Sequence, residues 1–134
     1  MERADFQRWL NDYVEAWRTY DPAKIGALFA DDATYRYHPQ DEPVTSREQI
    51  VASWLDEPDE PGTYEGHYEP LAINGEIHVA QGVSRYFDGE GNLRDEYCNI
   101  YVCRFDEAGR CTDFTEFWIQ NRQFRRAQAA SQDG

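Results

Sequence analysis

The chain has 134 residues, a length typical of one domain with a single hydrophobic core. Its 26 acidic residues outnumber 13 basic residues, and the formal net charge is −13. A charge this negative repels phosphate backbones, so we expect no nucleic-acid partner. No apolar run approaches the ~18 residues of a membrane span, and the first residues are charged rather than apolar. These features predict a cytoplasmic protein with no membrane partner.

Three helices are predicted in the first half of the chain. Residues 3–19 carry a stripe with a period of 3.6, formed by Phe6, Trp9, Leu10, Tyr13, Val14 and Trp17. Asp21 and Pro22 predict the start of a second helix, because Asp caps helices and Pro suits the first position. We expect this helix to end at residues 31–32. Thr45 or Ser46 is expected to cap a third helix.

Strands are predicted in the rest of the chain. Alternation over residues 34–38 predicts a short strand between the second and third helices. Longer strands are expected at 63–73 and 76–87, where Asn74-Gly75 favours a hairpin turn. A closing hairpin, rich in aromatic and β-branched residues, is expected at 97–105 and 110–120.

The order of these elements, helices first and strands last, is typical of the α+β class. We predict one domain over residues 1–122, in which the first helix covers one face of an antiparallel sheet. Residues 123–134 show no packing pattern and are predicted to be a flexible tail. The three cysteines, Cys98, Cys103 and Cys111, form no CxxC motif, which predicts reduced thiols.

Glu116, in the last predicted strand, is the strongest candidate for chemistry. It lies among the large apolar residues Phe114, Phe117, Trp118 and Ile119. Burial in such a wall raises the pKa of a carboxyl, which suits a general acid or base near neutrality. The alternative is a structural carboxylate that pairs with Arg85 or accepts a hydrogen bond from a tyrosine, because an unpaired buried carboxylate is unfavourable.

Arg85 shares a predicted strand face with Ile77, Val79, Val83 and Phe87. It would either point into a pocket, as the partner of Glu116 or an anchor for an acidic ligand, or reach the rim and solvent. We expect no metal site, because the three histidines lie on separate segments without a complete ligand set. No glycine-rich phosphate loop is present, so no cofactor is expected.

Two segments resemble the superfamily named for nuclear transport factor 2, and in particular its SnoaL-like polyketide cyclase and ketosteroid isomerase domains. They are residues 13–34, with the phrase Leu-Phe-Ala-Asp-Asp-Ala, and residues 105–118, which end in Glu-Phe-Trp. The resemblance implies a cone-shaped curved antiparallel sheet, wrapped by three N-terminal helices around an apolar pocket. It also implies that the protein forms a homodimer.

The resemblance further implies which residues face the pocket. With a lone acid facing an aromatic cavity, we expect Glu116 to transfer a proton, Tyr13 and Tyr37 to polarise a substrate carbonyl or hydroxyl, and Arg85 to set the charge of Glu116. The residues expected to bind ligand are Trp17, Tyr35, Trp54, Tyr97, Asn99, Tyr101, Phe114 and Trp118. The partner carboxylates of ketosteroid isomerases and limonene epoxide hydrolases are replaced in this sequence, so neither mechanism carries over as it stands.

The sequence therefore predicts a domain that binds a small apolar, oxygen-bearing molecule. If it is an enzyme, we expect a cofactor-free isomerase, cyclase or dehydratase that uses acid–base chemistry. The alternatives are a non-catalytic ligand-binding or dimeric interaction domain, and a scaffold whose cavity is filled by its own side chains. A void of ~300 Å³ or more would favour a ligand site over a filled scaffold.

Overall fold

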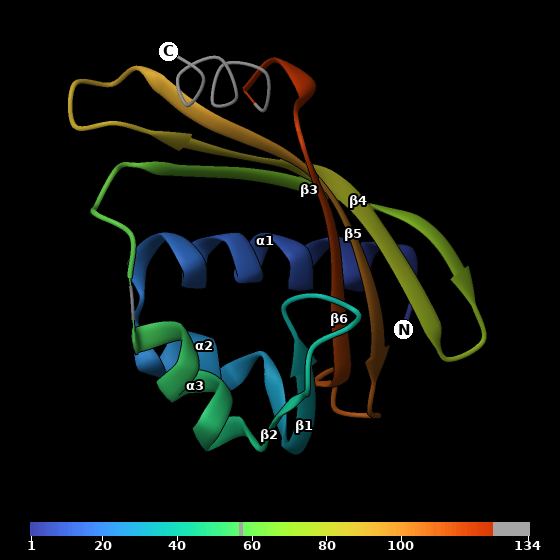
Figure 1. Cartoon of the computed structure of the whole chain (residues 1–134). Coiled ribbons are helices and arrows are strands. Elements are labelled where there is room, and N and C mark those ends of the chain that lie inside the picture. The colour runs from blue at the N-terminus through green and yellow to red at the C-terminus, as the bar shows by residue number, and fades with distance from the viewer. Residues whose placement is uncertain (57, 125–134) are drawn as a thin grey trace.

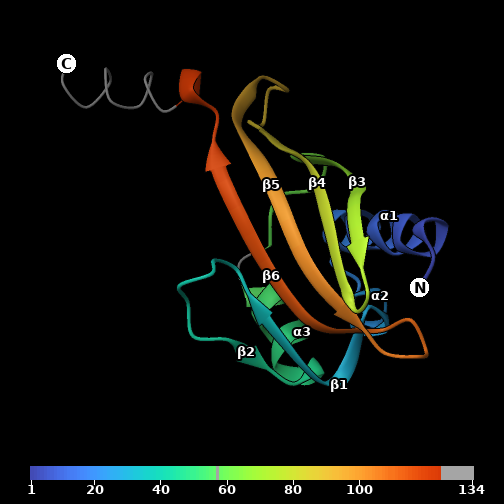
Figure 2. The same cartoon turned by 90° about the vertical axis from the view of Figure 1, so that its right-hand side faces the viewer.

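The computed structural model describes residues 1–56 and 58–124. One sheet of six strands dominates this part of the chain, in the order β2-β1-β6-β5-β4-β3. The strands are β1 (Phe29–Arg36), β2 (Val44–Thr45), β3 (Tyr64–Asn74), β4 (Ile77–Phe87), β5 (Leu93–Phe105) and β6 (Cys111–Gln120). The sheet is strongly curved and does not close into a barrel (Figures 1 and 2).

The three predicted helices are α1 (Arg3–Thr19), α2 (Pro22–Ala27) and α3 (Arg47–Asp56). Helix α1 crosses under the arch of the sheet, while α2 and α3 lie beside β1 and β2 (Figure 1). The aromatic stripe of α1 packs on the sheet, since Trp9 meets Phe105 and Tyr13 meets Phe114, with ring centroids 5.2 and 5.4 Å apart. This confirms the predicted α+β fold with helices covering a curved sheet.

The sheet departs from the predicted antiparallel pattern at one place. Strands β1 and β6 run parallel, whereas the other four pairings among the described residues are antiparallel. Strand β1 lies between β2, its neighbour in sequence, and β6, the last strand of the chain, and a long connection does not force the antiparallel direction that a hairpin imposes. The predicted antiparallel sheet is thus correct for the hairpins and wrong for this pairing.

The second helix is shorter than predicted, and the first strand begins earlier. Helix α2 ends at Ala27, and Phe29 already pairs with Cys111 in the sheet. The Cys111 amide donates to the Leu28 carbonyl at 2.8 Å. An irregularity between Phe29 and Thr34 interrupts the alternation, which is why the sequence did not show the strand from its start.

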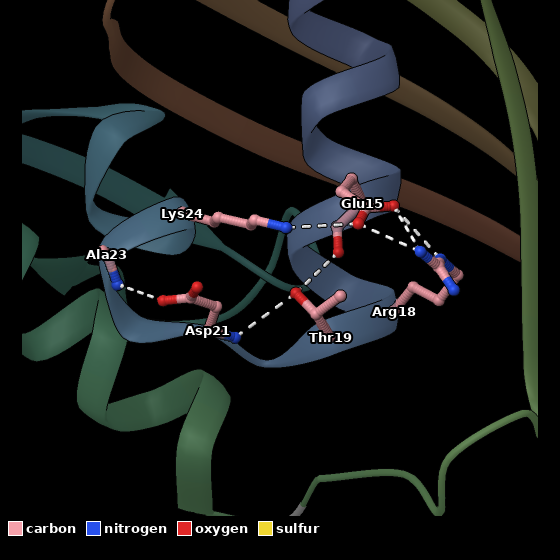
Figure 3. Close-up of polar contacts among 6 residues, drawn as sticks. All are labelled: Glu15, Arg18, Thr19, Asp21, Ala23 and Lys24. Atoms are coloured by element: carbon pink, nitrogen blue, oxygen red, sulfur yellow. Dashed lines mark hydrogen bonds and ion pairs between the residues drawn. The ribbon is translucent and has the colours of Figure 1, made fainter.

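Polar contacts fix the corner between α1 and α2 (Figure 3). Glu15 accepts hydrogen bonds from Arg18 at 2.8 Å and from Lys24 at 3.2 Å, so that it bridges the two helices. The Asp21 side chain accepts from the Ala23 amide at 2.9 Å, which confirms the predicted cap of α2. This corner holds the C-terminal end of α1, where the cavity described below is located.

The predicted tail lies largely outside the described residues. Residues 122–124 are helical, and the Phe124 amide donates to the Asn121 carbonyl at 3.1 Å. The three cysteines are free thiols: Cys103 and Cys111 are buried and Cys98 is exposed. Among the helices of the described part of the chain, none is long and apolar enough to cross a membrane.

Candidate functional site

A cavity of about 360 Å³ lies between the inner face of the sheet and α1. Its walls come from α1, the end of β1, the loop that contains Asp59, the start of β3, the end of β4, the start and middle of β5 and the end of β6. These ends meet on one side of the molecule, where the β4–β5 hairpin extends beyond α1 (Figure 1). Ten of the residues that line it are Tyr or Trp, so the wall is aromatic and carries many hydroxyl groups.

Glu116 of β6 is one of three carboxylates among the described residues that line this cavity. It is mostly buried, and burial raises its pKa to about 7, although a hydrogen bond from Asn99 works in the opposite direction. The Asn99 amide nitrogen donates to Glu116 Oε1 at 2.8 Å. Among the described residues, no side chain donates to the other oxygen, Oε2. Glu116 can therefore lose or gain a proton near neutral pH.

Two tyrosine hydroxyls lie deep in the cavity. The hydroxyl oxygens of Tyr13 and Tyr35 are 3.0 Å apart, and both side chains are buried. Burial raises the pKa of each phenol well above its usual value, and the charge of Glu116 raises it further. Both phenols consequently stay neutral and can act as hydrogen-bond donors at physiological pH.

Most of the residues expected at the site line this cavity. They are Tyr13, Trp17, Tyr35, Tyr37, Tyr97, Asn99, Tyr101, Glu116 and Trp118. Tyr37 lies just beyond the end of β1, and its hydroxyl is 2.7 Å from Ser53 Oγ of α3. The predicted inward faces of β5 and β6 are therefore the faces that meet the cavity.

Arg85 lies on the opposite side of the sheet, which corrects the expectation that it would be the partner of Glu116. Its guanidinium Nε donates to Glu96 at 2.8 Å, and a second nitrogen is 3.7 Å from Glu65. The buried residues of β4 are His78, Ala80 and Ser84, on the face away from Arg85. The aliphatic residues of β4 cover the outer face instead, because aromatic rings from α1 and β3 fill the inner side.

Phe114 and Trp54 belong to the core rather than to the cavity wall, so the structure does not place them as expected. The Phe114 ring stacks between Tyr13 and Tyr35, with centroids 5.4 and 4.6 Å away. Trp54 packs edge-on against Tyr13 and Trp17, at 5.2 and 4.6 Å. Both residues support the rings that face the cavity.

The sequence analysis missed seven residues of the wall: Asp59, Tyr64, Tyr68, Ser84, Tyr86, Arg94 and Asp95. Tyr64 and Tyr68 share the inner face of β3, so their spacing was a usable signal. Asp59 had no such signal, since it belongs to an irregular acidic loop. The Tyr20 hydroxyl holds it in place by donating to its carboxylate at 2.9 Å and accepting from its amide at 3.0 Å.

The charges around the cavity are mostly negative. Among the described residues, the charged groups that line it are three carboxylates, those of Glu116, Asp59 and Asp95, and one guanidinium, that of Arg94. No cluster of three or more His, Cys, Asp or Glu side chains in the described residues could hold a metal ion. The site thus offers one buried acid–base group, several neutral hydroxyl donors and an aromatic surface.

Comparisons with known proteins agree with this architecture. The family model of the SnoaL-like domain matches residues 10–114, so the chain belongs to this family of the nuclear transport factor 2-like superfamily. Its fold is similar to that of a nuclear transport factor 2-like protein of unknown function from Burkholderia xenovorans LB400, with a TM-score of 0.66 and 15% sequence identity. The match covers 88% of this chain and 85% of the other. Among curated proteins, none matches the sequence.

Proposed function

We propose that the cavity is the active site of a cofactor-free enzyme in which Glu116 transfers a proton. The observation that carries this proposal is a carboxyl with a pKa of about 7 at an aromatic cavity, with one oxygen held by Asn99. At that pKa both protonation states are populated at neutral pH, so the same group can accept a proton and return it.

The substrate in this proposal is a small, flat molecule that carries a carbonyl or hydroxyl oxygen. The cavity volume of about 360 Å³ suits a small ligand, and its aromatic wall suits an unsaturated one. Because carboxylates outnumber the single Arg94, an anionic substrate is disfavoured and a neutral one fits better.

The tyrosines supply the hydrogen bond to the substrate oxygen. Tyr13 and Tyr35 share one hydrogen bond between two hydroxyls, so one hydroxyl hydrogen of the pair stays available for a ligand. As Glu116 removes a proton next to a carbonyl, negative charge develops on the carbonyl oxygen, and a neutral phenol stabilises it. Return of the proton to another carbon gives an isomerisation. Transfer of the same proton from Glu116 to a hydroxyl on the β-carbon, which then leaves as water as the C=C bond forms, gives a dehydration.

Hydrogen exchange tests this proposal without knowledge of the natural substrate. A panel of small neutral aryl and unsaturated ketones is incubated in D₂O, and proton NMR follows deuterium entry beside the carbonyl. We expect the wild type to accelerate exchange for part of the panel, and Glu116→Gln to lose at least about 100-fold of that acceleration. Equal exchange rates for the two proteins would contradict the catalytic role.

A matched control is Glu96→Gln, which removes a carboxylate from the outer face of the sheet. Glu96 pairs with Arg85 and does not line the cavity. This variant should keep the exchange activity of the wild type. Loss of exchange in both variants would point to general destabilisation rather than to chemistry at Glu116.

A second candidate function, a dimeric interaction domain of the same fold, is favoured by the outer face of the sheet. Phe117 and Ile119 of β6 are 43% and 72% exposed, and they border a hollow with Val83 and Ile100. Exposed apolar surface of this kind is typical of protein interfaces. We propose that a second copy of the chain covers it, and light scattering should then give about twice the monomer mass of 15.7 kDa.

A further inference from the structure

A row of hydrogen-bonded side chains crosses the inner face of the sheet and ends on Glu116. It runs through Tyr64, Tyr68, Ser84, Asn99 and Glu116. The Tyr64 and Tyr68 hydroxyls are 2.8 Å apart, and Ser84 donates to the Asn99 oxygen at 2.8 Å. Tyr68, Ser84 and Asn99 are almost fully buried, so water does not replace these bonds readily.

The polarity of this row follows from the single hydrogen on each hydroxyl. Ser84 uses its hydrogen on Asn99 Oδ1, so in its contact with Tyr68 it must accept. Tyr68 in turn uses its hydrogen on Ser84, so it must accept from Tyr64. Every donor therefore points toward Glu116, and the Asn99 amide delivers the last hydrogen bond to Oε1.

Two glycines inside the strands make room for the row. A Cβ atom at Gly66 of β3 would lie 2.1 Å from the Tyr64 hydroxyl. A Cβ atom at Gly82 of β4 would lie 2.4 Å from the Tyr68 ring and 2.1 Å from the His67 carbonyl oxygen. Glycine weakens the interior of a strand, so both positions point to a need for space rather than to a strand preference.

We propose that Asn99, Ser84 and Tyr68 are positioning residues for Glu116. They keep Oε1 as the acceptor of the Asn99 hydrogen bond, so that Oε2 is the oxygen that exchanges the proton. A proton on Oε1 would point at the Asn99 N–H group, and two hydrogen-bond donors that face each other repel. The proton therefore resides on Oε2, the oxygen without a partner among the described residues. The inference rests on the proposed role of Glu116, and it adds which oxygen reacts and which residues decide this.

Other titratable and charged groups also lie near Glu116 and could affect its pKa. Phenols surround it from every packed element: Tyr13 on α1, Tyr35 on β1, Tyr37 after β1, Tyr68 on β3, Tyr86 on β4 and Tyr101 on β5. Burial raises the pKa of each phenol, so none of them ionises near neutrality. The charged groups of the cavity wall are Asp59, Arg94 and Asp95.

The test is the pKa of Glu116 in the ligand-free protein, followed by carbon-13 NMR of labelled glutamate carboxyls. The resonance that disappears in Glu116→Gln identifies the residue. Asn99→Leu, of similar size, removes the donor to Oε1, so the pKa should rise by about one to two units. Ser84→Ala and Tyr68→Phe should raise it by progressively smaller amounts, because they act through the Asn99 amide.

The sign of these shifts decides the proposal. In the alternative arrangement the hydrogen bonds run in the opposite direction, and a protonated Glu116 donates to Asn99. The row would then stabilise the neutral acid, and Ser84→Ala would lower the pKa of Glu116. A lowered or unchanged pKa in both Ser84→Ala and Tyr68→Phe would overturn the proposal. These two mild variants keep the test open even if Asn99→Leu does not fold.

A control variant separates positioning from general loosening of the sheet. Thr34→Val removes a hydrogen bond of 3.0 Å to Asp113, between β1 and β6, without touching the row. It should leave the pKa of Glu116 unchanged. Because the titration needs no substrate, it can support the row even if the exchange assay shows no catalysis, so the two proposals can fail separately.

Discussion

The inner and outer faces of the sheet carry opposite kinds of side chain. On β4 the inner face has the small residues Ala80, Gly82 and Ser84, whereas Val79 and Val83 lie on the outer face. The small residues leave space for rings that arrive from α1 and β3. In a curved sheet around a cavity, therefore, small side chains on one strand mark the side toward which larger side chains of other elements point.

Two carboxylates show what this difference means for electrostatics. On the outer face, hydrogen bonds from Arg85 and then Asn121 lower the pKa of Glu96. On the inner face, where no described cation pairs with it, burial raises the pKa of Glu116 to about 7. The same residue type is thus a stable anion on one side of the sheet and a titrating group on the other.

The largest effect that separates these two carboxylates should appear in stability against pH. The folded-state pKa of Glu116 is raised from 4.5 to about 7, so the folded protein holds this proton over a range where the unfolded chain has lost it. Between these pH values the free energy of unfolding of the wild type, relative to Glu116→Gln, should fall by about 3 kcal/mol as pH rises. Urea unfolding at several pH values measures the difference.

Glu96 supplies the opposite sign in the same experiment. Its folded-state pKa is lowered, so its stabilising contribution is present above the pKa of the unfolded chain and is lost as pH falls. Relative to Glu96→Gln, the wild type should gain stability with rising pH. Parallel pH profiles for the two variants would show that burial does not distinguish the two carboxylates.

The sequence predicted the helices and strands of the fold better than it predicted which side of each strand points inward. The period of α1 and the cap at Asp21 were each determined by local chemistry. The inner face of β4 was not, because an alternation of aliphatic and small residues does not say which set is covered by rings from distant segments. That ambiguity led to the wrong expectation for Arg85. The resemblance to a known family supplied the inward direction of Glu116.

The row that ends on Glu116 was hidden from the sequence for a related reason. Its members Tyr64, Ser84 and Asn99 lie on three different strands, and only strand pairing brings them together. The sequence did contain one signal, the glycines at positions 66 and 82 within strand patterns. Glycine inside a strand indicates the close approach of another group.

A substitution at Gly82 tests this use of space on the inner face. Gly82→Ala places a methyl group against backbone and ring atoms that have little room to move. We expect a loss of about 1–3 kcal/mol in the free energy of unfolding, the usual range for overpacking. Gly89→Ala is the control, because a Cβ atom there meets nothing within 4 Å. Equal urea midpoints for the two variants would contradict the packing argument.

The smallest effect is expected at Arg85, on the outer face. Its side chain is 42% exposed, and solvent screens its pairs with Glu96 and Glu65. Arg85→Met keeps the length of the side chain and removes its charge, so the melting temperature should stay within about 3 °C of the wild type. The hydrogen-exchange activity should also be unchanged, since Arg85 does not reach the cavity. A large loss of activity would mean that the two faces communicate through β4, and the separation drawn between them would then be wrong.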